Sequence, residues 1–259
     1  MLPTMLTRVL AGLCLLATLI VGLVGCATPP TDPEERAEWE QINDPLEPMN
    51  RGIFDFNMAL DRNIMKPVAI AYRDYIPAEL RLMMHNVLAN LNSPLIFASD
   101  LLQGEGKRAA TTFARAVVNT TLGVGGLSDV AAELDLPRHE EDAGQTFAVW
   151  GVRDGPYLML PLLGPSNPRD TAGLAVEFVS DPLSIYLKNI DMAYMGVVRG
   201  GFSAVDTRVE FIDSLDAIER TSLDFYSTIR SVSRQYRAEQ IRNQAALDQG
   251  YGDLAKQPR

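Results

Sequence analysis

The chain has 259 residues, of which 47% are apolar and 22% charged, and its formal net charge is −10. This length allows one sizeable domain, and the composition is that of an ordinary globular protein. An acidic chain lacks the basic patch that nucleic acid requires, so we expect no nucleic-acid partner. Charge does not favour adhesion to anionic lipid either, so membrane contact would have to come from covalent lipid and apolar surface.

The first 25 residues have the features of a secretory signal. Arg8 precedes an apolar run over residues 9–24, which is marginal as a permanent span because a transmembrane helix needs about 20 apolar residues. The run ends in LVGC at 23–26, which resembles a bacterial lipobox. That resemblance implies cleavage before Cys26 and a diacylglycerol on its thiol. The alternative is an ordinary small residue near a standard cleavage site.

The cysteine content agrees with a lipobox. Cys14 lies inside the signal, so the mature chain keeps only Cys26 and cannot form an internal disulfide. Several acyl chains on Cys26 would make the anchor effectively permanent, since each buried CH₂ contributes about 0.8 kcal/mol. Ala27 follows the cysteine, whereas Asp at this position would resemble an inner-membrane retention signal. We therefore expect a lipid-anchored protein on the periplasmic face of a Gram-negative outer membrane.

The composition along the chain predicts three segments after the signal peptide of residues 1–25. Residues 26–43 are predicted to be an acylated tether, because prolines and glutamates dominate there and argue against a packed core. Residues 44–237 are predicted to form one helical domain, and residues 238–259 a polar C-terminal tail.

Helical spacing of apolar residues dominates the first half of the folded domain. It predicts a helix over 50–64, a second from Lys66 that Pro77 ends, and an apolar stripe over 80–91 that Pro94 interrupts. A further helix is predicted over 107–121, and a turn follows at Gly123, Gly125 and Gly126.

The second half is less regular. Residues 144–164 are rich in glycine, proline and aromatic residues, and we expect an ordered irregular loop with at most short extended pieces. No proline occurs between Pro182 and Pro258, so we expect one or two long helices there. The fold class is therefore mainly α, a bundle of amphipathic helices with an irregular Gly/Pro-rich loop region.

Motifs for catalysis or cofactor binding are absent from the sequence. It contains no G-x-S-x-G and no G-x-x-x-x-G-K-[ST], and the turn at 123–126 does not complete G-x-G-x-x-G. His139 with Glu140, Glu141 and Asp142 could form a metal cluster, but a solvated acidic turn is favoured because zinc sites use closely spaced His and Cys ligands. His85, in a methionine-rich segment, is expected to be a packed or interfacial side chain. We expect no enzyme activity, no cofactor and no metal.

One stretch, residues 93–108, is unusually apolar. It is too short to span a bilayer, and it could be a buried core helix or a helix lying in one leaflet. An anchor at Cys26 favours the second interpretation. The candidate membrane contacts are Leu95, Ile96, Phe97, Leu101 and Leu102.

Four blocks carry a resemblance to a known family. NDPLEPMNRGIFDFN at 43–57, KPVAIAYRDYIP at 66–77, NTTLGVGGLSDVA at 119–131 and GPYLMLPLLGPSNPRD at 155–170 are similar to the MlaA (VacJ) outer-membrane lipoproteins. The resemblance implies a ring-like helical body seated in one leaflet, the inner leaflet of the outer membrane. It also implies a passive channel that removes mislocalised phospholipid from the outer leaflet and helps maintain lipid asymmetry.

The same resemblance implies partners and site residues. The partners are phospholipid, a trimeric porin and a soluble periplasmic phospholipid carrier similar to MlaC. Phe56 and Asn57 match the N-terminal motif and are candidates for the pore entrance, with helix packing and capping as the alternative. Gly123, Gly125 and Gly126 are candidates for a tight turn beside the pore. Arg169 with Asp170 is a candidate for a local ion pair, with a headgroup contact as the alternative. The alternative function is a porin-associated adaptor lipoprotein without a lipid conduit; an esterase is disfavoured because the nucleophile motif is missing.

Overall fold

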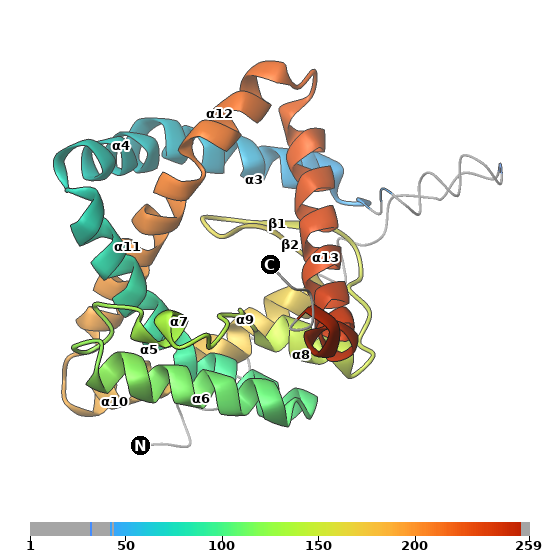
Figure 1. The fold of residues 1–259 in the computed structure, drawn as a ribbon. Coiled ribbons are helices and arrows are strands. Elements are labelled where there is room, and N and C mark those ends of the chain that lie inside the picture. Colours follow the sequence, from blue (N-terminus) through green and yellow to red (C-terminus); the bar gives the residue numbers. More distant parts are fainter. Residues whose placement is uncertain (1–31, 33–41, 43, 255–259) are drawn as a thin grey trace, which may run out of the picture.

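A computed structural model gives the fold, and it describes residues 32, 42 and 44–254 (Figure 1). The signal over 1–25, Cys26 and almost all of the predicted tether lie outside the described residues. The described chain is mostly helical, which confirms the mainly α prediction. Its elements are α3 (Glu47–Leu60), η1 (Asp61–Met65), α4 (Lys66–Tyr75), α5 (Ala78–Gln103), α6 (Gly106–Thr121), α7 (Val130–Glu133), α8 (Ala143–Val149), β1 (Leu158–Leu160), β2 (Gly164–Ser166), α9 (Pro168–Ser180), α10 (Pro182–Asn189), α11 (Tyr194–Glu210), α12 (Ile212–Thr221) and α13 (Phe225–Leu254).

The helices are arranged around a centre, as the ring-like prediction requires. Figure 1 shows α3 and α4 along one side, α5 on the next, α6 and α8 on the third and α13 on the fourth. Helix α5 packs against α6 and α8, α8 packs against α13, and α12 joins α13 to α4. The antiparallel hairpin β1–β2 contacts α3 and α13 and extends into the space that the helices surround.

Helices α3, η1 and α4 form one uninterrupted helical segment. The predicted boundary at Lys66 is present, but no loop separates the two helices. Pro67 lies in the first turn of α4, and the five-residue π-helical segment η1 directly precedes it. A proline clashes with the carbonyl four residues before it in a regular α-helix, whereas the hydrogen bonds of a π-helical turn run over five residues. The wider turn therefore lets the chain pass through Pro67 while staying helical.

The predicted interruption at Pro94 is wrong. Helix α5 continues through Pro94 from Ala78 to Gln103 and ends at Gly104, which adopts a left-handed conformation. Proline removes one hydrogen bond from the helix interior, but α6 and α8 pack along α5 on the part that contains it. Tertiary packing thus outweighs the local helix-breaking preference.

Residues 144–164 are not only an irregular loop. The segment contains helix α8 and a short hairpin, in which Met159 pairs with Pro165. The Asp142 side chain caps α8 by accepting the backbone N–H of Gln145 at 2.8 Å, and the Gln145 amide returns a 3.0 Å bond to Asp142 Oδ2. Both bonds end on the Asp142 carboxylate, which is the N-cap of α8, and the spacing D-x-x-Q was the sequence signal for the start of the helix.

The prediction of one or two long helices after Pro182 is also wrong, because α10, α11, α12 and α13 share this segment. The chain turns between α10 and α11 at Asp191, which has a positive φ of 58°. Ser222, in extended conformation, ends α12. Helix α13 continues across residue 238, where the polar tail is predicted to begin, so the start of that tail is helical.

A small core and a polar cluster join the two ends of the domain. The core consists of Phe54, Tyr157, Met159 and Tyr226. Asp44 accepts hydrogen bonds from Asn50 Nδ2 at 2.7 Å, Tyr226 Oη at 2.5 Å and Arg230 Nη1 at 2.8 Å. Asn50 also accepts the Met159 amide, which ties the hairpin to α3. These contacts link α3 to α13 and so close the ring of helices.

The distribution of polarity is inverted relative to an ordinary globular protein. The largest fully buried side chains in the described chain are Gln145, Asn50, Thr146 and Asp100, which are all polar. Large apolar side chains lie at the surface of most helices; examples are Leu101, Phe113, Phe178, Val179, Tyr186 and Val197. Large apolar side chains gathered at a surface are typical of protein or membrane contact. None of the helices in the described residues combines the length and apolar character needed to cross a bilayer.

Candidate functional site

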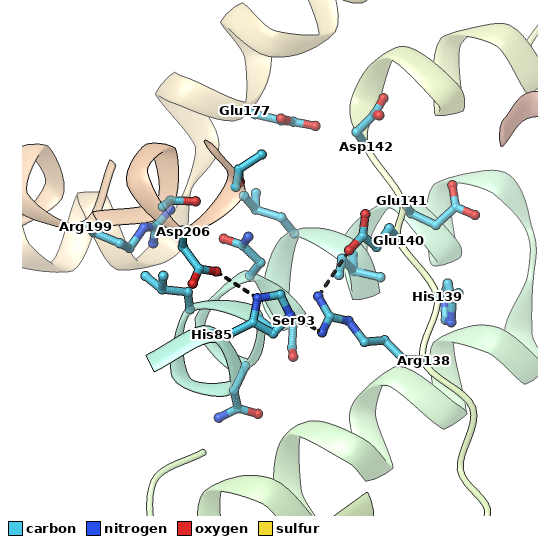
Figure 2. Close-up of a pocket in the computed structure, with 18 of the residues that line it drawn as sticks. His85, Ser93, Arg138, His139, Glu140, Glu141, Asp142, Glu177, Arg199 and Asp206 are labelled. Atoms are coloured by element: carbon cyan, nitrogen blue, oxygen red, sulfur yellow. Dashed lines mark hydrogen bonds and ion pairs between the residues drawn. The ribbon is translucent and has the colours of Figure 1, made fainter. Parts of the chain in front are cut away.

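A polar cavity lies among the helices and is the candidate site. It has a volume of about 680 Å³, and α5, α6, the segment 138–142, α9, α10, α11 and α13 contribute to its walls. Figure 2 shows charged side chains entering it from several elements: His85 from α5, Arg199 and Asp206 from α11, Glu177 from α9, and Arg138 with Glu140 from the connecting segment. Residues far apart in the sequence therefore meet in one space.

His85 is at the centre of a hydrogen-bonded chain across this cavity. Its Nδ1 lies 2.8 Å from Asp206 Oδ2, and its Nε2 lies 2.9 Å from Arg138 Nη1. Arg138 also donates to Glu140 Oε1 at 3.1 Å (Figure 2). A guanidinium can only donate, so His85 Nε2 accepts and Nδ1–H donates to Asp206. The chain of contacts connects α5, α11 and the segment 138–142.

The same region contains three groups at metal-ligand spacing. Nδ1 of His85, a carboxylate oxygen of Asp206 and one of Glu210 lie within 4.8 Å of one another. Arg138, however, requires the imidazole tautomer that carries its proton on Nδ1, the atom that would have to bind the cation. The observed geometry is therefore that of a hydrogen-bonded cluster, and we assign no metal to it.

Segment 139–142 forms neither a metal cluster nor a simple solvated turn. His139 Nε2 contacts Asp100 Oδ1 at 2.9 Å, Glu141 accepts from Arg108 at 2.9 Å, and Asp142 accepts from Arg237 at 2.6 Å. The four side chains point to separate partners instead of converging on one point. Glu140 is exposed, as a solvated turn would predict, but Glu141 is buried, and for that residue the prediction is wrong.

The carboxylates in the walls, of which Glu141 is buried while Glu177 and Asp129 are half-buried, differ in how their charge is compensated. Burial raises the pKa of Glu177 above its usual range, and the Ala143 amide, which donates to Oε1 at 2.7 Å, only partly opposes this. Burial likewise raises the pKa of Glu141, against the opposing effects of Gln103 and Arg108. For Asp129 burial acts in the same direction, but hydrogen bonds from Arg115 and Asn119 outweigh it and lower the pKa. The cavity therefore contains carboxylates that lack full compensation.

The predicted membrane-contact residues fall into two groups. Leu95 and Ile96 are half-buried and line the cavity. Phe97 is half-buried as well, with its ring 6.0 Å from that of Phe113. Leu101 and Leu102, at the end of α5, are more than half exposed, at 54% and 58%. Only the last two therefore occupy the exposed position that a lipid contact needs.

Phe56 and Asn57 are adjacent but have different environments. Phe56 is exposed on α3. The Asn57 side chain faces the hairpin, where Nδ2 donates to the Leu160 carbonyl at 2.9 Å and Oδ1 accepts the Leu162 amide at 2.8 Å. Leu162 has a positive φ of 67°, so the asparagine holds a tight hairpin tip. The side chains of Leu162 and Leu163 at this tip are exposed.

The glycine turn after α6 lies against the cavity wall. Gly126 has a φ of 93°, and a Cβ on it would lie 2.9 Å from Cβ of Asn90, a residue that lines the cavity. Gly125 has a φ of 72° with open space around it. At Gly123 the reason for glycine is a close backbone contact, because a Cβ there would lie 2.2 Å from the Ser128 carbonyl oxygen. The turn is thus both tight and packed, beside the cavity.

The ion pair predicted between Arg169 and Asp170 is present, with Arg169 Nε 2.9 Å from Asp170 Oδ1. A second arginine that was not predicted, Arg237 of α13, bridges Asp170 to Asp142 at distances of 2.6 to 2.9 Å. It therefore connects the N-termini of α8 and α9 to the last helix.

Sequence reasoning missed the contribution of α11 to the cavity. Arg199, Ser203, Asp206 and Glu210 all line it and are spaced four, three and four residues apart. That spacing places them on one face of a helix. A polar stripe with helical periodicity was therefore the available signal, although it does not distinguish a cavity wall from a solvent-exposed face.

These features define a class: a mainly α, ring-like protein with a polar interior cavity and an apolar exterior. Comparison with known proteins gives its family. The family model described as MlaA lipoprotein matches residues 42–240. The chain belongs to the MlaA lipoprotein family.

Relatives at the level of sequence and structure agree with this assignment. The chain is 37% identical over 212 residues to the intermembrane phospholipid transport system lipoprotein MlaA of Shigella flexneri, covering 80% of each chain. It is 36% identical over 212 residues to the protein of the same name from Escherichia coli (strain K12), again covering 80% of each. A solved structure reported under "Structural basis for maintenance of bacterial outer membrane lipid asymmetry" matches with a TM-score of 0.68 and 35% identity, over 76% of this chain and 98% of that one.

Proposed function

We propose that this protein is an outer-membrane lipoprotein, anchored through acylated Cys26, that removes mislocalised phospholipid from the outer leaflet and passes it to a periplasmic carrier. It acts as a passive conduit and thereby maintains the lipid asymmetry of the outer membrane. The names of its relatives, which refer to intermembrane phospholipid transport, support this function. The inverted distribution of polarity, described above, is the structural observation that carries it.

A phospholipid that changes leaflet has to move a charged headgroup through hydrocarbon. Burying an ionised group without partners is very costly, and this cost is the barrier to spontaneous exchange. A polar cavity provides hydrogen-bonding and charged groups that replace water around the headgroup, while the acyl chains stay in lipid. The cavity of about 680 Å³ with His85, Arg138 and Arg199 in its walls has the required polar character.

The exposed apolar side chains support the proposed seating in the inner leaflet of the outer membrane. Exposed apolar side chains on α5, α6, α9 and α11 can enter the acyl region, as amphipathic helices in an interface do. An acidic chain would gain nothing from anionic lipid, so the acyl anchor and this apolar surface supply the affinity. We propose no catalytic step, because movement between leaflets leaves every covalent bond of the lipid intact.

A trimeric porin and a soluble carrier are the proposed protein partners. Exposed apolar patches also mark protein interfaces, and this observation favours a second candidate function, a porin-associated adaptor without a conduit. The two candidates differ in one respect: only the first requires phospholipid inside the polar cavity.

The test is the amount of phospholipid in the outer leaflet of cells that lack this protein. The cells are complemented with the wild type or with Cys26→Ala, and surface phospholipid is labelled with a membrane-impermeant reagent. We expect accumulation in the deletion strain that the wild type reverses and Cys26→Ala does not. Normal outer-leaflet phospholipid in deletion cells with unchanged porin levels would refute the conduit and favour the adaptor.

The anchor itself is tested separately by intact mass. The mature protein purified from membranes should begin at Cys26 and carry the mass of the attached acyl chains. An uncleaved signal, or an unmodified Cys26, would refute the proposed anchor.

A further inference from the structure

The charged groups of the cavity suggest a preference among phospholipid headgroups. Carboxylates outnumber arginines among the lining residues, so the cavity as a whole repels a purely anionic ligand. It nevertheless contains arginine donors, which a phosphate requires. A ligand that carries both a phosphate and an ammonium group fits this combination better than one with negative charge alone.

Glu177 is a half-buried carboxylate whose charge is only partly compensated. Its Oε1 accepts the Ala143 amide at 2.7 Å, and among the described residues it has no ion-pair partner. Burial and the nearby Asp142 raise the pKa of Glu177, and the nearby Arg237 opposes them only in part. Figure 2 shows the Glu177 side chain on the cavity side of α9. Because no cation lies within ion-pair distance of Glu177 in the described chain, an ammonium group brought to this position would add to the partial compensation from Arg237.

Arg199 supplies the complementary donor. One of its terminal nitrogens, Nη2, pairs with Asp181 at 2.9 Å. The other, Nη1, is buried and has no hydrogen-bond partner in the described chain. A buried unpaired donor is costly, and one at the wall of a ligand cavity is commonly satisfied by a ligand acceptor. A phosphodiester oxygen is such an acceptor, and guanidinium is the side chain best suited to it.

We infer that the cavity selects phospholipids with a zwitterionic, primary-ammonium headgroup over anionic ones, with Arg199 Nη1 donating to the phosphate and the Glu177 carboxylate binding the ammonium. Both residues line the same cavity, from α11 and α9. This inference rests on the proposed function, since it requires phospholipid to enter the cavity. It adds the headgroup class that the site accepts.

The test measures which lipids the full-length acylated protein retains. Detergent-solubilised protein is equilibrated with vesicles of equal parts dioleoyl-phosphatidylethanolamine and dioleoyl-phosphatidylglycerol and re-isolated, and its bound lipids are quantified by mass spectrometry. We expect the ethanolamine lipid to be enriched over the glycerol lipid. In Glu177→Gln this enrichment should fall about fivefold, the size of effect expected for one partly screened charge pair.

The variants separate the cavity from lipid bound at the exterior. Glu177→Gln keeps an Oε1 that accepts the Ala143 amide, so the fold is retained while the charge is removed. Arg199→Gln should lower retention of both lipids, because both contain a phosphate. The controls Glu79→Gln and Arg153→Gln make the same changes at exposed positions outside the cavity and should behave as the wild type.

Two outcomes overturn different statements. Lipid retained by the wild type in the vesicle proportion, or an enrichment that Glu177→Gln does not reduce, would refute the headgroup preference and leave the conduit intact. A wild-type protein that retains no phospholipid at all would instead count against the proposed function. Thermal unfolding of each variant identifies any that lose lipid only because the fold is lost.

Discussion

At the scale of single residues, polar side chains hold this molecule together. Asn50, Asn57 and Arg237 each connect elements that are distant in the sequence, and each makes at least two hydrogen bonds across that distance. Buried polar groups contribute specificity because an unmade hydrogen bond costs more than a made one gains. The hairpin is therefore positioned by asparagines as well as by the hydrophobic contacts of Met159.

Asn57→Ala should loosen the hairpin tip. The substitution removes both the donor to the Leu160 carbonyl and the acceptor for the Leu162 amide, so we expect a loss of about 1–3 kcal/mol in the free energy of unfolding. Amide hydrogen exchange should accelerate at Leu162 in particular. Asn63→Ala, which removes a single exposed bond to the Ala59 carbonyl, is the matched control and should change little. Unchanged exchange at the tip would show that other contacts hold the hairpin.

At the scale of elements, helix caps and close contacts between helix backbones decide the arrangement. The side chains of Asp129, Asp142, Asn167 and Asp181 cap α7, α8, α9 and α10. Such caps satisfy orphan backbone donors and set where each helix starts. Helices α8 and α9 approach so closely at Gly144 and Gly173 that a side chain cannot fit between them.

Gly173→Ala should separate these two helices. A Cβ on Gly173 would lie 2.3 Å from the Gly144 backbone nitrogen, so one helix has to shift. We expect destabilisation of about 1–3 kcal/mol, the usual cost of overpacking, measured by denaturant unfolding in detergent. Gly52→Ala in α3 is the control, because nothing lies within 4 Å of its Cβ. It should stabilise the helix by up to about 1 kcal/mol. Equal effects of both substitutions would contradict the close crossing.

At the scale of the whole molecule, the buried and half-buried carboxylates make the stability depend on pH in two directions. The pKa values of Asp129 and Asp142 are lowered: burial raises them, but arginine partners outweigh burial. The stability that these two carboxylates give the folded state is fully present above the ordinary Asp pKa of 3.8. It is lost as the pH falls through their lowered pKa values. Burial raises the pKa values of Glu141 and Glu177, so the folded state gains stability as pH falls towards their ordinary value of 4.5.

We therefore expect the Tm to be highest at mildly acidic pH, around 5, and to fall on both sides. Thermal unfolding between pH 3 and about 8 measures this. Glu177→Gln should reduce the increase in Tm between neutral and mildly acidic pH. The fall in Tm at more acidic pH should remain. A Tm that declines steadily from neutral pH downwards would show that the raised carboxylates contribute little.

The apolar exterior makes a second prediction at this scale. Charge placed on a lipid-facing surface opposes insertion, so Leu101→Glu combined with Phe113→Glu should weaken association with phospholipid vesicles at least about tenfold. Both positions are more than half exposed, so folding should be little affected. Ser231→Glu with Gln235→Glu adds the same charge at exposed polar positions of α13 and serves as the control. Vesicle flotation of the unacylated proteins measures the difference, and equal flotation of both variants would exclude α5 and α6 from the lipid contact.

Much of the local structure was predictable because its determinants are local. The apolar periodicity of residues 107–121, the break at Pro77 and the glycine turn at 123–126 all appear in the fold as predicted. The D-x-x-Q spacing at the start of α8 also indicates a helix. It was missed because the surrounding sequence is rich in glycine and proline, which favours a loop. Pro94 shows the limit of local preference, since packing against neighbouring helices keeps α5 intact.

The sequence by itself determined the helical class, the family and the candidate anchor, because periodicity, ordered motif blocks and a lipobox are all written along the chain. Only the tertiary structure decided which face of each helix is inside. An amphipathic pattern shows that two faces differ, but it does not say which one meets solvent, lipid or a cavity. The contact of His85 with Asp206, and the position of both Glu177 and Arg199 in the lining of one cavity, depend on how distant helices pack. The inverted polarity on which the proposed function rests is therefore a property of the assembled ring, not of any one helix.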